Sequence, residues 1–221
     1  MSRIVLKVGG AVAAEAATLA RVLTQEHEVC VVHGAGPQIS AELERAGLEV
    51  RFVDGRRVTS AAALRVVRSS FAAVNAGVCA SIGPQAVPLF GDEIGLEAVR
   101  VPELGHVGSP LPSSPAAIED ALAAGLVPVV APLGVGPLNV NADEAAAALA
   151  VGLRADKLLF ATDVPGLLLG GAVASTIRVA EAERMLAAGE LGGGIVPKLH
   201  AAVVATRSGV DAAIGATAVV A

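Results

Sequence analysis

Arg3-Ile-Val-Leu-Lys7-Val8-Gly9-Gly10 is the stretch that decides the fold. Its β-branched, apolar run predicts a buried strand, and the two glycines predict a tight turn after it. The same pattern of an apolar run and a glycine-rich turn occurs next in Glu28–His33 and Gly34-Ala35-Gly36. Alanine-rich amphipathic segments at Ala13–Leu23 and Pro37–Ala46 come after these turns and predict helices. Two consecutive strand–turn–helix units indicate a largely parallel sheet.

The alternation continues to the end of the chain. It predicts a three-layer αβα sandwich with a central, mostly parallel open sheet, because continuous apolar strands need helices on both faces. Further helices are expected at Ser60–Cys79, with Ser60 as the N-cap, Pro115–Ala124, Asp143–Leu153, Ala180–Ala188 and Val196–Arg207. Further strands are expected at Ala86–Phe90, Leu96–Val101, Leu126–Ala131, Lys157–Ala161, Val210–Ile214 and Ala216–Val220.

Length and composition limit the possible functions. The 221 residues fit one large domain or two lobes, and the loop at Pro102–Ser114, rich in Gly, Pro and Ser, is the candidate boundary. No apolar run of about 20 residues predicts a membrane span, and the N-terminal stretch does not read as a signal peptide. A net charge of −5, with no Trp or Tyr, argues against nucleic acid as a partner. Two isolated cysteines, Cys30 and Cys79, predict buried thiols of a cytoplasmic protein.

Lysine is scarce, with three residues against thirteen arginines. Lys7 and Lys198 lie beside glycine-rich turns, whereas Lys157 follows Arg154-Ala-Asp156 and is interpreted as solvated charge. The ammonium group of lysine is a compact charge, whereas the guanidinium of arginine is planar. Lys7 and Lys198 are therefore candidates for a site that requires a compact ammonium.

Three glycine-rich turns fall at the carboxyl ends of predicted strands, where open parallel sheets bind ligands. They are Gly9-Gly10, Gly34-Ala35-Gly36 and Asp163-Val-Pro-Gly166. Each could be an ordinary strand-to-helix turn, but two in consecutive units, one of them after Lys7, favour phosphate binding. The chain has no P-loop motif, and Ile39 takes the third glycine position of a dinucleotide fingerprint.

Seven motifs, in order, closely resemble the N-acetylglutamate kinases of the amino-acid kinase family, across nearly the whole chain. They are Lys7-Val-Gly-Gly10, His33-Gly-Ala-Gly-Pro37, Gly55-Arg-Arg-Val-Thr59, Gly105-His-Val-Gly108, Asn139-Val-Asn-Ala-Asp143, Asp163-Val-Pro-Gly166 and Ile195-Val-Pro-Lys198. The resemblance implies a carbamate kinase-like fold and transfer of the γ-phosphoryl group of MgATP to the side-chain carboxylate of N-acetyl-L-glutamate, in arginine biosynthesis. It also implies an N-terminal lobe (1–132) for acetylglutamate and dimerisation, and a shortened C-terminal lobe (133–221) for the nucleotide.

The resemblance assigns roles to single residues. Lys7 and Lys198 supply positive charge, and Asp143 organises the two ammonium groups, although an ordinary helix N-cap is the alternative for Asp143. Substrate binding falls to Ala35, Gly36, Arg57, Asn139 and Asn141, with Arg57 on the α-carboxylate. Phosphate binding falls to Gly9, Gly10 and Gly34. Nucleotide binding falls to Asp163, Val164, Pro165, Gly166, Leu167, Leu168, Glu190, Leu191 and Gly192.

The chemistry agrees with this pattern. A side-chain carboxylate with a pKa near 4.3 is ionised at neutral pH, so the transfer needs no general base. His33 is expected to be a packed histidine, His106 structural and His200 exposed on a helix. Arg56 is expected to be a solvated neighbour of Arg57. No protein ligand set is expected for Mg²⁺, which keeps phosphate and water ligands.

Two departures from the family pattern raise further expectations. Ala35 replaces a glycine and would be strained by about 1 kcal/mol or more if φ there were positive. After Ile214 the chain turns at once into Ala216–Val220, where relatives carry a loop and helix, so nucleotide affinity is in question. With no helix before the first strand, we expect a homodimer that arginine does not inhibit through such a helix. A kinase for an N-blocked aminoadipate of lysine biosynthesis, or an inactive ligand-binding relative, are the alternatives.

Overall fold

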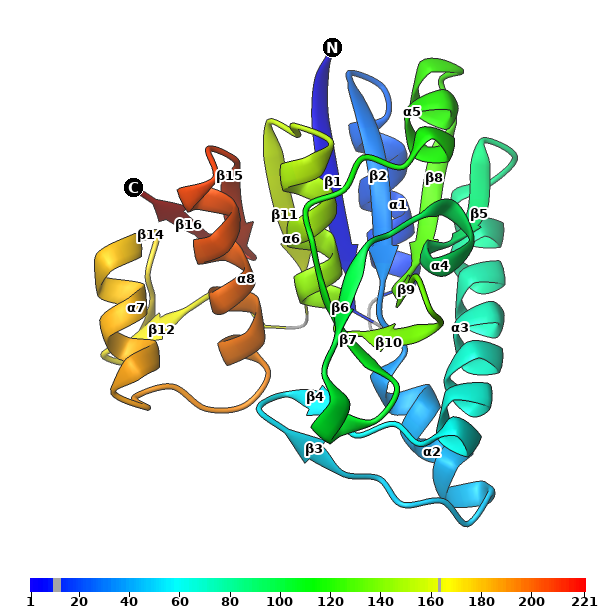
Figure 1. The fold of residues 1–221 in the computed structure, drawn as a ribbon. Helices are drawn as coiled ribbons and strands as arrows, with labels where there is room; N and C mark the ends of the chain where they lie inside the picture. The colour runs from blue at the N-terminus through cyan, green and yellow to red at the C-terminus, as the bar shows by residue number, and fades with distance from the viewer. Residues whose placement is uncertain (10–12, 163) are drawn as a thin grey trace.

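The computed structural model describes residues 1–9, 13–162 and 164–221, and its centre is an eight-stranded sheet (Figure 1). The strand order is β14-β16-β15-β11-β1-β2-β8-β5. All neighbours are parallel except β15 and β16, which form an antiparallel hairpin. The strands are β1 (Ser2–Val8), β2 (His27–His33), β5 (Ala86–Phe90), β8 (Val127–Ala131), β11 (Lys157–Ala161), β14 (Thr176–Arg178), β15 (Asp211–Ile214) and β16 (Thr217–Val220).

Alternate residues of the central strands enter two separate cores, which makes the molecule a three-layer sandwich. Val5 of β1 and Val32 of β2 pack in the core formed with the helices on one face, whereas Leu6 and Val31 pack in the core of the other face. This follows from the period of two along a strand. The predicted fold class is confirmed.

Helices cover both faces of the sheet (Figure 1). On one face lie α1 (Ala13–Leu23) and α3 (Ala61–Ile82), with α2 (Gly36–Arg45) packed against α3. On the other lie α5 (Ala116–Ala123), α6 (Ala142–Gly152) and α8 (Ile195–Arg207), with α7 (Val179–Ala187) beside α8.

A second sheet of four short strands stands at the carboxyl end of the central strands. Its order is β6-β7-β10-β9, with β6 (Ala98–Arg100), β7 (Val107–Pro110), β9 (Leu133–Gly134) and β10 (Leu138–Val140). Two small hairpins complete the fold: β3 (Phe52–Val53) with β4 (Arg56–Arg57), and β12 (Leu168–Leu169) with β13 (Ala172–Val173). The short helix α4 (Gly91–Ile94) and the 3₁₀ turn η1 (Pro102–Leu104) connect strands.

The long elements match their predicted ranges within three residues, and Ser60 caps α3 by accepting a hydrogen bond from the Ala63 N–H at 3.1 Å. The prediction of an irregular loop over Pro102–Ser114 is wrong, because η1 and β7 lie within it. β7 pairs with β6 and β10, so long-range pairing overrides the turn-forming composition of this segment. Among the described residues, no helix combines the length and apolar character that a membrane span requires.

Candidate active site

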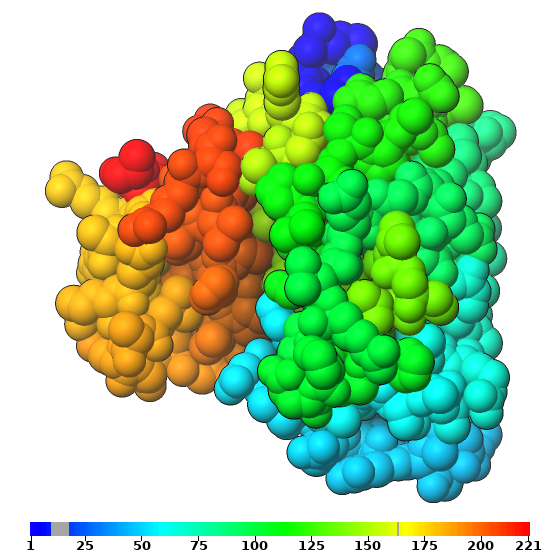
Figure 2. All heavy atoms as spheres, in the orientation of Figure 1, coloured from blue at the N-terminus to red at the C-terminus, as the bar shows by residue number. Residues whose placement is uncertain are grey.

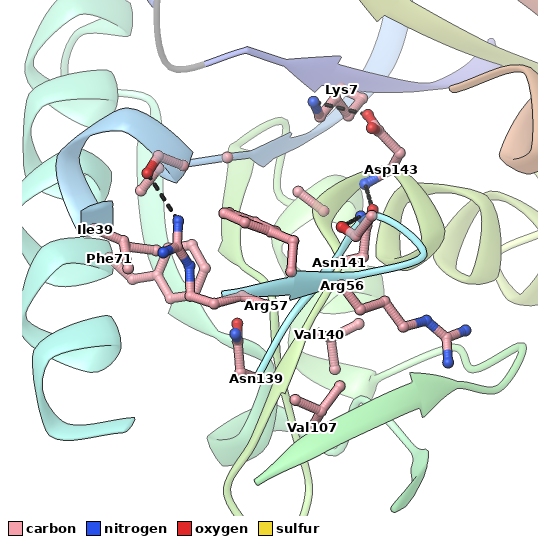
Figure 3. A pocket seen from close by; sticks show the side chains of 16 residues that line it. Lys7, Ile39, Arg56, Arg57, Phe71, Val107, Asn139, Val140, Asn141 and Asp143 are labelled. Atoms are coloured by element: carbon pink, nitrogen blue, oxygen red, sulfur yellow. Dashed lines mark hydrogen bonds and ion pairs between the residues drawn. The ribbon is translucent and has the colours of Figure 1, made fainter. Parts of the chain in front are cut away.

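A cavity of about 210 Å³ lies at the carboxyl ends of β1 and β2, between the central sheet, the β3–β4 hairpin and the start of α6 (Figure 3). This is where an open parallel sheet places its ligand site. The cavity is lined by Lys7, Gly34, Ala35, Gly36, Ile39, Phe52, Gly55, Arg56, Arg57, Phe71, Val107, Asn139, Val140, Asn141, Ala142 and Asp143. Its volume is below the roughly 300 Å³ lower bound for drug-sized ligands, which suits a small acid better than a nucleotide.

Two ammonium groups meet at one carboxylate beside this cavity. Lys7 Nζ lies 2.7 Å from Asp143 Oδ1, and Lys198 Nζ lies 3.5 Å from Asp143 Oδ2. The side chains are only 6%, 7% and 13% exposed for Lys7, Asp143 and Lys198 respectively. The cluster carries one net positive charge in a site that is shielded from water, so an anion placed there would be strongly attracted.

Three different elements bring this cluster together. Lys7 is the penultimate residue of β1, Asp143 is in the first turn of α6, and Lys198 is in the first turn of α8. Lys198 Nζ also donates to the Gly194 carbonyl at 3.2 Å, which holds the side chain near the start of its helix.

Asp143 is not the cap of its helix, so the alternative of an ordinary N-cap is wrong. Asn141 is the N-cap of α6, and its Oδ1 accepts hydrogen bonds from the N–H groups of Asp143 at 2.8 Å and Glu144 at 3.2 Å. The cap therefore leaves the Asp143 carboxylate for the two lysines.

Arg57 lines the cavity and has one buried donor without a hydrogen-bond partner among the described residues. Its Nη2 donates to the Gly36 carbonyl at 3.1 Å and to Ser40 Oγ at 2.9 Å, while Nη1 is buried and has no hydrogen-bond partner among the described residues. The guanidinium carbon stands 4.5 Å from the centre of the Phe52 ring. Burial lowers the pKa of Arg57. A buried guanidinium with an open edge is suited to binding a carboxylate.

The glycine turn after β2 lies against the first turn after β1. The Gly34 N–H donates to the Val8 carbonyl at 2.9 Å, and the Gly9 N–H donates to the Ala161 carbonyl at 3.2 Å. Ala35 has φ −143°, so its side chain carries no left-handed strain, and it is 2% exposed. Gly10 and Asp163 lie outside the described residues.

Two helices that begin at the site lack side-chain caps. Neither Ala35 at the start of α2 nor Gly194 at the start of α8 makes a side-chain cap hydrogen bond. Backbone N–H groups at such helix starts are available to an anion, and the helix dipoles favour negative charge there.

Asn139 and Asn141 both line the cavity, and each already has a protein partner. Asn139 Nδ2 donates to Thr59 Oγ1 at 3.0 Å, and Asn141 Nδ2 donates to the Gly55 carbonyl at 3.3 Å. These bonds tie the segment that carries Arg57 to the start of α6.

His33 is a packed core residue, as expected. It is 1% exposed, and the Asn75 Nδ2 group lies 3.1 Å from its Nε2. Asn75 Nδ2 also donates to the Val129 carbonyl at 2.9 Å, so this nitrogen is the donor toward His33 as well. Burial, with a smaller contribution from Lys7, lowers the pKa of His33 from 6.5 to about 4. His33 is therefore neutral at physiological pH, and its low pKa and burial make it a poor general base.

The segment predicted to bind nucleotide packs on the β15–β16 turn. The Leu167 N–H donates to Thr217 Oγ1 at 2.8 Å, and the Ala216 N–H donates to the Pro165 carbonyl at 2.8 Å. Leu167 is buried in the core while Leu168 is 57% exposed. Val164 and Leu191 are half-buried, Gly166 is buried, and Pro165, Glu190 and Gly192 are exposed. Glu190 pairs with Arg184 at 2.5 Å. These residues lie apart from the set that lines the small cavity.

Sequence reasoning missed part of the site. Phe52 and Phe71 line the cavity. The chain has four Phe, and this scarcity is the sequence signal that could have marked them as site residues. The expectation that Arg56 is solvated is wrong. Its Nε and Nη2 donate to the two Glu144 carboxylate oxygens at 2.9 and 2.8 Å, and its side chain is 26% exposed. Lys157 and His200 are exposed, as expected.

Known proteins are similar to this chain in sequence and in fold. The model of the amino acid kinase family matches residues 2–215. The chain is 42% identical to an acetylglutamate kinase of Rubrobacter xylanophilus, covering 97% of this chain and 88% of the relative. It is 41% identical to an acetylglutamate kinase of Methanopyrus kandleri, covering 95% and 93% respectively.

Solved structures agree on the fold. The structure of smu.665 from Streptococcus mutans superposes with a TM-score of 0.88 at 26% identity, covering 99% of this chain and 98% of the other. A Giardia lamblia carbamate kinase bound to AMP-PNP gives 0.72 at 15% identity over 99% and 98% of the two chains. The chain belongs to the amino acid kinase family.

Proposed function

We propose that this protein transfers the γ-phosphoryl group of ATP to the side-chain carboxylate of N-acetyl-L-glutamate, giving N-acetyl-glutamyl 5-phosphate and ADP. The observation that carries the proposal is the pair of ammonium groups held at Asp143 beside a small cavity. The two relatives described above, both acetylglutamate kinases, support the choice of substrate.

The transfer requires charge compensation rather than proton abstraction. A carboxylate oxygen of the substrate forms a bond to phosphorus while the bond from phosphorus to the ADP oxygen breaks. The attacking carboxylate is already ionised, so no base is needed. In this proposal Lys7 and Lys198 supply positive charge on both sides of the transferring group, and the contact of both ammonium groups with Asp143 supports its role in organising them. Positioning and electrostatic stabilisation supply most of the catalysis in reactions of this kind.

The acceptor occupies the small cavity in this proposal. The open edge of Arg57 binds the α-carboxylate, and Asn139, Asn141 and the N–H groups of Ala35 and Gly36 contact the remaining polar atoms. In this proposal the transferring phosphoryl group lies beside Gly9 and Gly34, the residues that follow β1 and β2, whose own N–H groups donate to the Ala161 and Val8 carbonyls and are not among its donors.

The nucleotide binds to the C-terminal part, with the N-terminal lobe taken as 1–132 and the C-terminal lobe as 133–221. Residues 163–168 and 190–192 hold the adenosine side. Pro165 and Leu167 pack on the short β15–β16 turn, which has only Gly215 and Ala216 between the paired residues Ile214 and Thr217, and this gives the nucleotide a platform.

Mg²⁺ would reach the site bound to the ATP phosphates. Among the described residues, no group of three His, Cys, Asp or Glu side chains is placed to hold a metal, and Asp143 is occupied by two lysines. Mg²⁺ loses its water ligands reluctantly and is commonly held through substrate phosphates. When bound, Mg²⁺ neutralises phosphate charge.

We also propose that the protein is a cytoplasmic homodimer of the arginine pathway. The outer face of α3 exposes mainly small residues, including Ala72, Ala73, Ala76 and Ala80, which would allow close packing of a second copy. Light scattering should give about twice the chain mass of 21.8 kDa. A monomer or hexamer would contradict this assembly.

Hydroxylamine trapping tests the activity. The acyl phosphate formed from acetylglutamate and MgATP reacts with hydroxylamine to a hydroxamate, which is measured as its ferric complex. We expect product with acetylglutamate and little with free glutamate. A preference for N-acetyl-aminoadipate would indicate the lysine-pathway kinase instead, and no product with either acceptor would indicate an inactive ligand-binding relative.

A further inference from the structure

The hairpin that carries Arg57 has little to hold it in place by itself. Among the residues that the structure describes, β3 and β4 pair only with each other, and residues 51–55 are exposed in succession. Its two-residue turn has Asp54 at φ 48° and Gly55 at φ 75°, the backbone of a type I′ turn. An isolated two-stranded hairpin is marginally stable in water. Its position over the cavity must therefore come from contacts with other elements.

Arg57 makes one such contact, with Gly36 and Ser40 of α2, and Arg56 makes a second one, with α6. Arg56 binds the Glu144 carboxylate through two parallel hydrogen bonds, at 2.9 and 2.8 Å, and both side chains are about three-quarters buried. Paired, planar contacts of this kind fix orientation as well as distance. The bond from Asn141 Nδ2 to the Gly55 carbonyl, at 3.3 Å, is longer and joins the same two elements.

The neighbours of this pair are the residues of the proposed reaction. Arg56 precedes Arg57, and Glu144 follows Asp143. Figure 3 shows Arg56 and Arg57 extending in opposite directions from β4, Arg57 toward α2 and Arg56 away from it. One strand thus offers its Arg57 side chain to the cavity while its Arg56 side chain is anchored on α6.

The hairpin also lies close to the helix that carries Lys198. A Cβ on Gly55 would lie 3.9 Å from Pro197 Cβ, and in Figure 2 the cyan atoms of the hairpin lie beside the orange atoms of α8. A second cavity, of about 630 Å³, is lined by the hairpin, η1 and the first turns of α8, and both Arg56 and Glu144 reach it.

We propose that the Arg56–Glu144 pair is a latch that holds the β3–β4 hairpin in its substrate-binding position, and that both are positioning residues for Arg57. This inference rests on the proposed function, because the affected ligand is N-acetyl-L-glutamate. When a fraction of molecules has the hairpin displaced, the apparent dissociation constant rises by the inverse of the competent fraction. For a bidentate ion pair that is partly exposed, we expect loss of the pair to raise the apparent dissociation constant about three- to tenfold.

The test is calorimetric titration of acetylglutamate without nucleotide, in Arg56→Met, Glu144→Gln and the double variant. Each single variant should weaken acetylglutamate binding about three- to tenfold, and the double variant should be no weaker than the worse single, because both substitutions remove the same contact. The KM for ATP should stay within twofold of wild type.

Glu28→Gln is the matched control. Glu28 is a partly buried carboxylate that pairs with Arg3 at 2.9 Å, at the opposite end of the sheet. It should change thermal stability without changing acetylglutamate binding. A charge-swapped variant, Arg56→Glu with Glu144→Arg, tests the pair if a single variant is poorly folded, and it should recover binding to within about threefold of wild type.

Equal binding by wild type and both single variants would overturn the latch while leaving the proposed function intact. Additive losses in the double variant would also overturn it, since the two side chains would then act separately. If wild-type protein neither binds acetylglutamate nor forms hydroxamate, the proposed function fails and the latch fails with it.

Discussion

At the scale of single residues, the two site lysines are where the shape of the cation matters. Lys7→Arg or Lys198→Arg keeps the charge, but a planar guanidinium cannot place a point charge where the ammonium stands. We expect kcat to fall by about 100-fold, the loss typical of a displaced electrostatic contact. Hydroxamate formation measures this. Lys157→Arg, at an exposed position on β11, is the control and should match wild type; near-normal turnover in either site variant would contradict the role of the ammonium.

The buried His33 predicts how stability depends on pH. Because its pKa is lowered from 6.5 to about 4 in the folded state, the unfolded chain binds the proton first as pH falls. The stability due to the neutral imidazole is present above about pH 6.5 and is lost as pH falls toward 4. Between pH 7 and pH 5 this amounts to about 2 kcal/mol.

Urea unfolding at pH 7 and pH 5 checks this expectation. The loss of unfolding free energy between the two pH values should be about 2 kcal/mol smaller in His33→Asn than in wild type. His200→Asn, at an exposed position on α8, should keep the wild-type loss. An unchanged loss in His33→Asn would show that the imidazole does not stay neutral in the fold.

At the scale of elements, Asn141 combines a helix cap with a place in the cavity wall. Asn141→Ala should lower the unfolding free energy by about 1 kcal/mol, and Asn141→Ser should restore most of it, because a hydroxyl can cap α6. Both variants should raise the KM for acetylglutamate if the amide contacts the substrate. The control is Ser60→Ala, which removes the cap of α3 at a similar cost in unfolding free energy and should leave the kinetics unchanged. If Asn141→Ser restored the wild-type KM for acetylglutamate, Asn141 would act as a helix cap and not as a substrate contact.

The long elements could be predicted from sequence because each has a clear period or cap. α1 and β11 have their expected bounds, and Ser60 marks the start of α3. The strands β9, β12, β13 and β14 were missed, since two or three residues show no period and pair only through the fold. The ion pair of Arg56 could not be predicted from sequence, because its partner Glu144 is distant along the chain.

At the scale of the whole molecule, the site is assembled from both halves of the chain. Lys7 and Arg57 come from the first half, Asp143 and Lys198 from the second. Sequence pattern alone predicts that each of these four residues lies near a turn. Only the family resemblance predicts that the four meet in one site. The distances between the lysines and Asp143 come from the fold. Their separate roles in binding and catalysis stay predictions.

A ligand that binds across these halves should stabilise the whole domain. Acetylglutamate at about 100 times its Kd adds about 2.7 kcal/mol, which corresponds to a rise in Tm of about 5–10 °C for a chain of this size. Differential scanning calorimetry measures the shift, and free glutamate is the control ligand. Arg57→Lys should abolish most of the rise; equal shifts with glutamate would argue against recognition of the acetyl group.

The strand order also has a consequence for how the chain folds during synthesis. Ile4 of β1 pairs with Val29 on one side and with Lys157 on the other. The strands β1, β2, β5 and β8 can therefore pair as soon as the first 131 residues have left the ribosome, since N-terminal units fold first. The edge of β1 then stays unpaired until β11 has been synthesised. During this interval the exposed edge can pair with a neighbouring nascent chain, so a short interval favours correct folding.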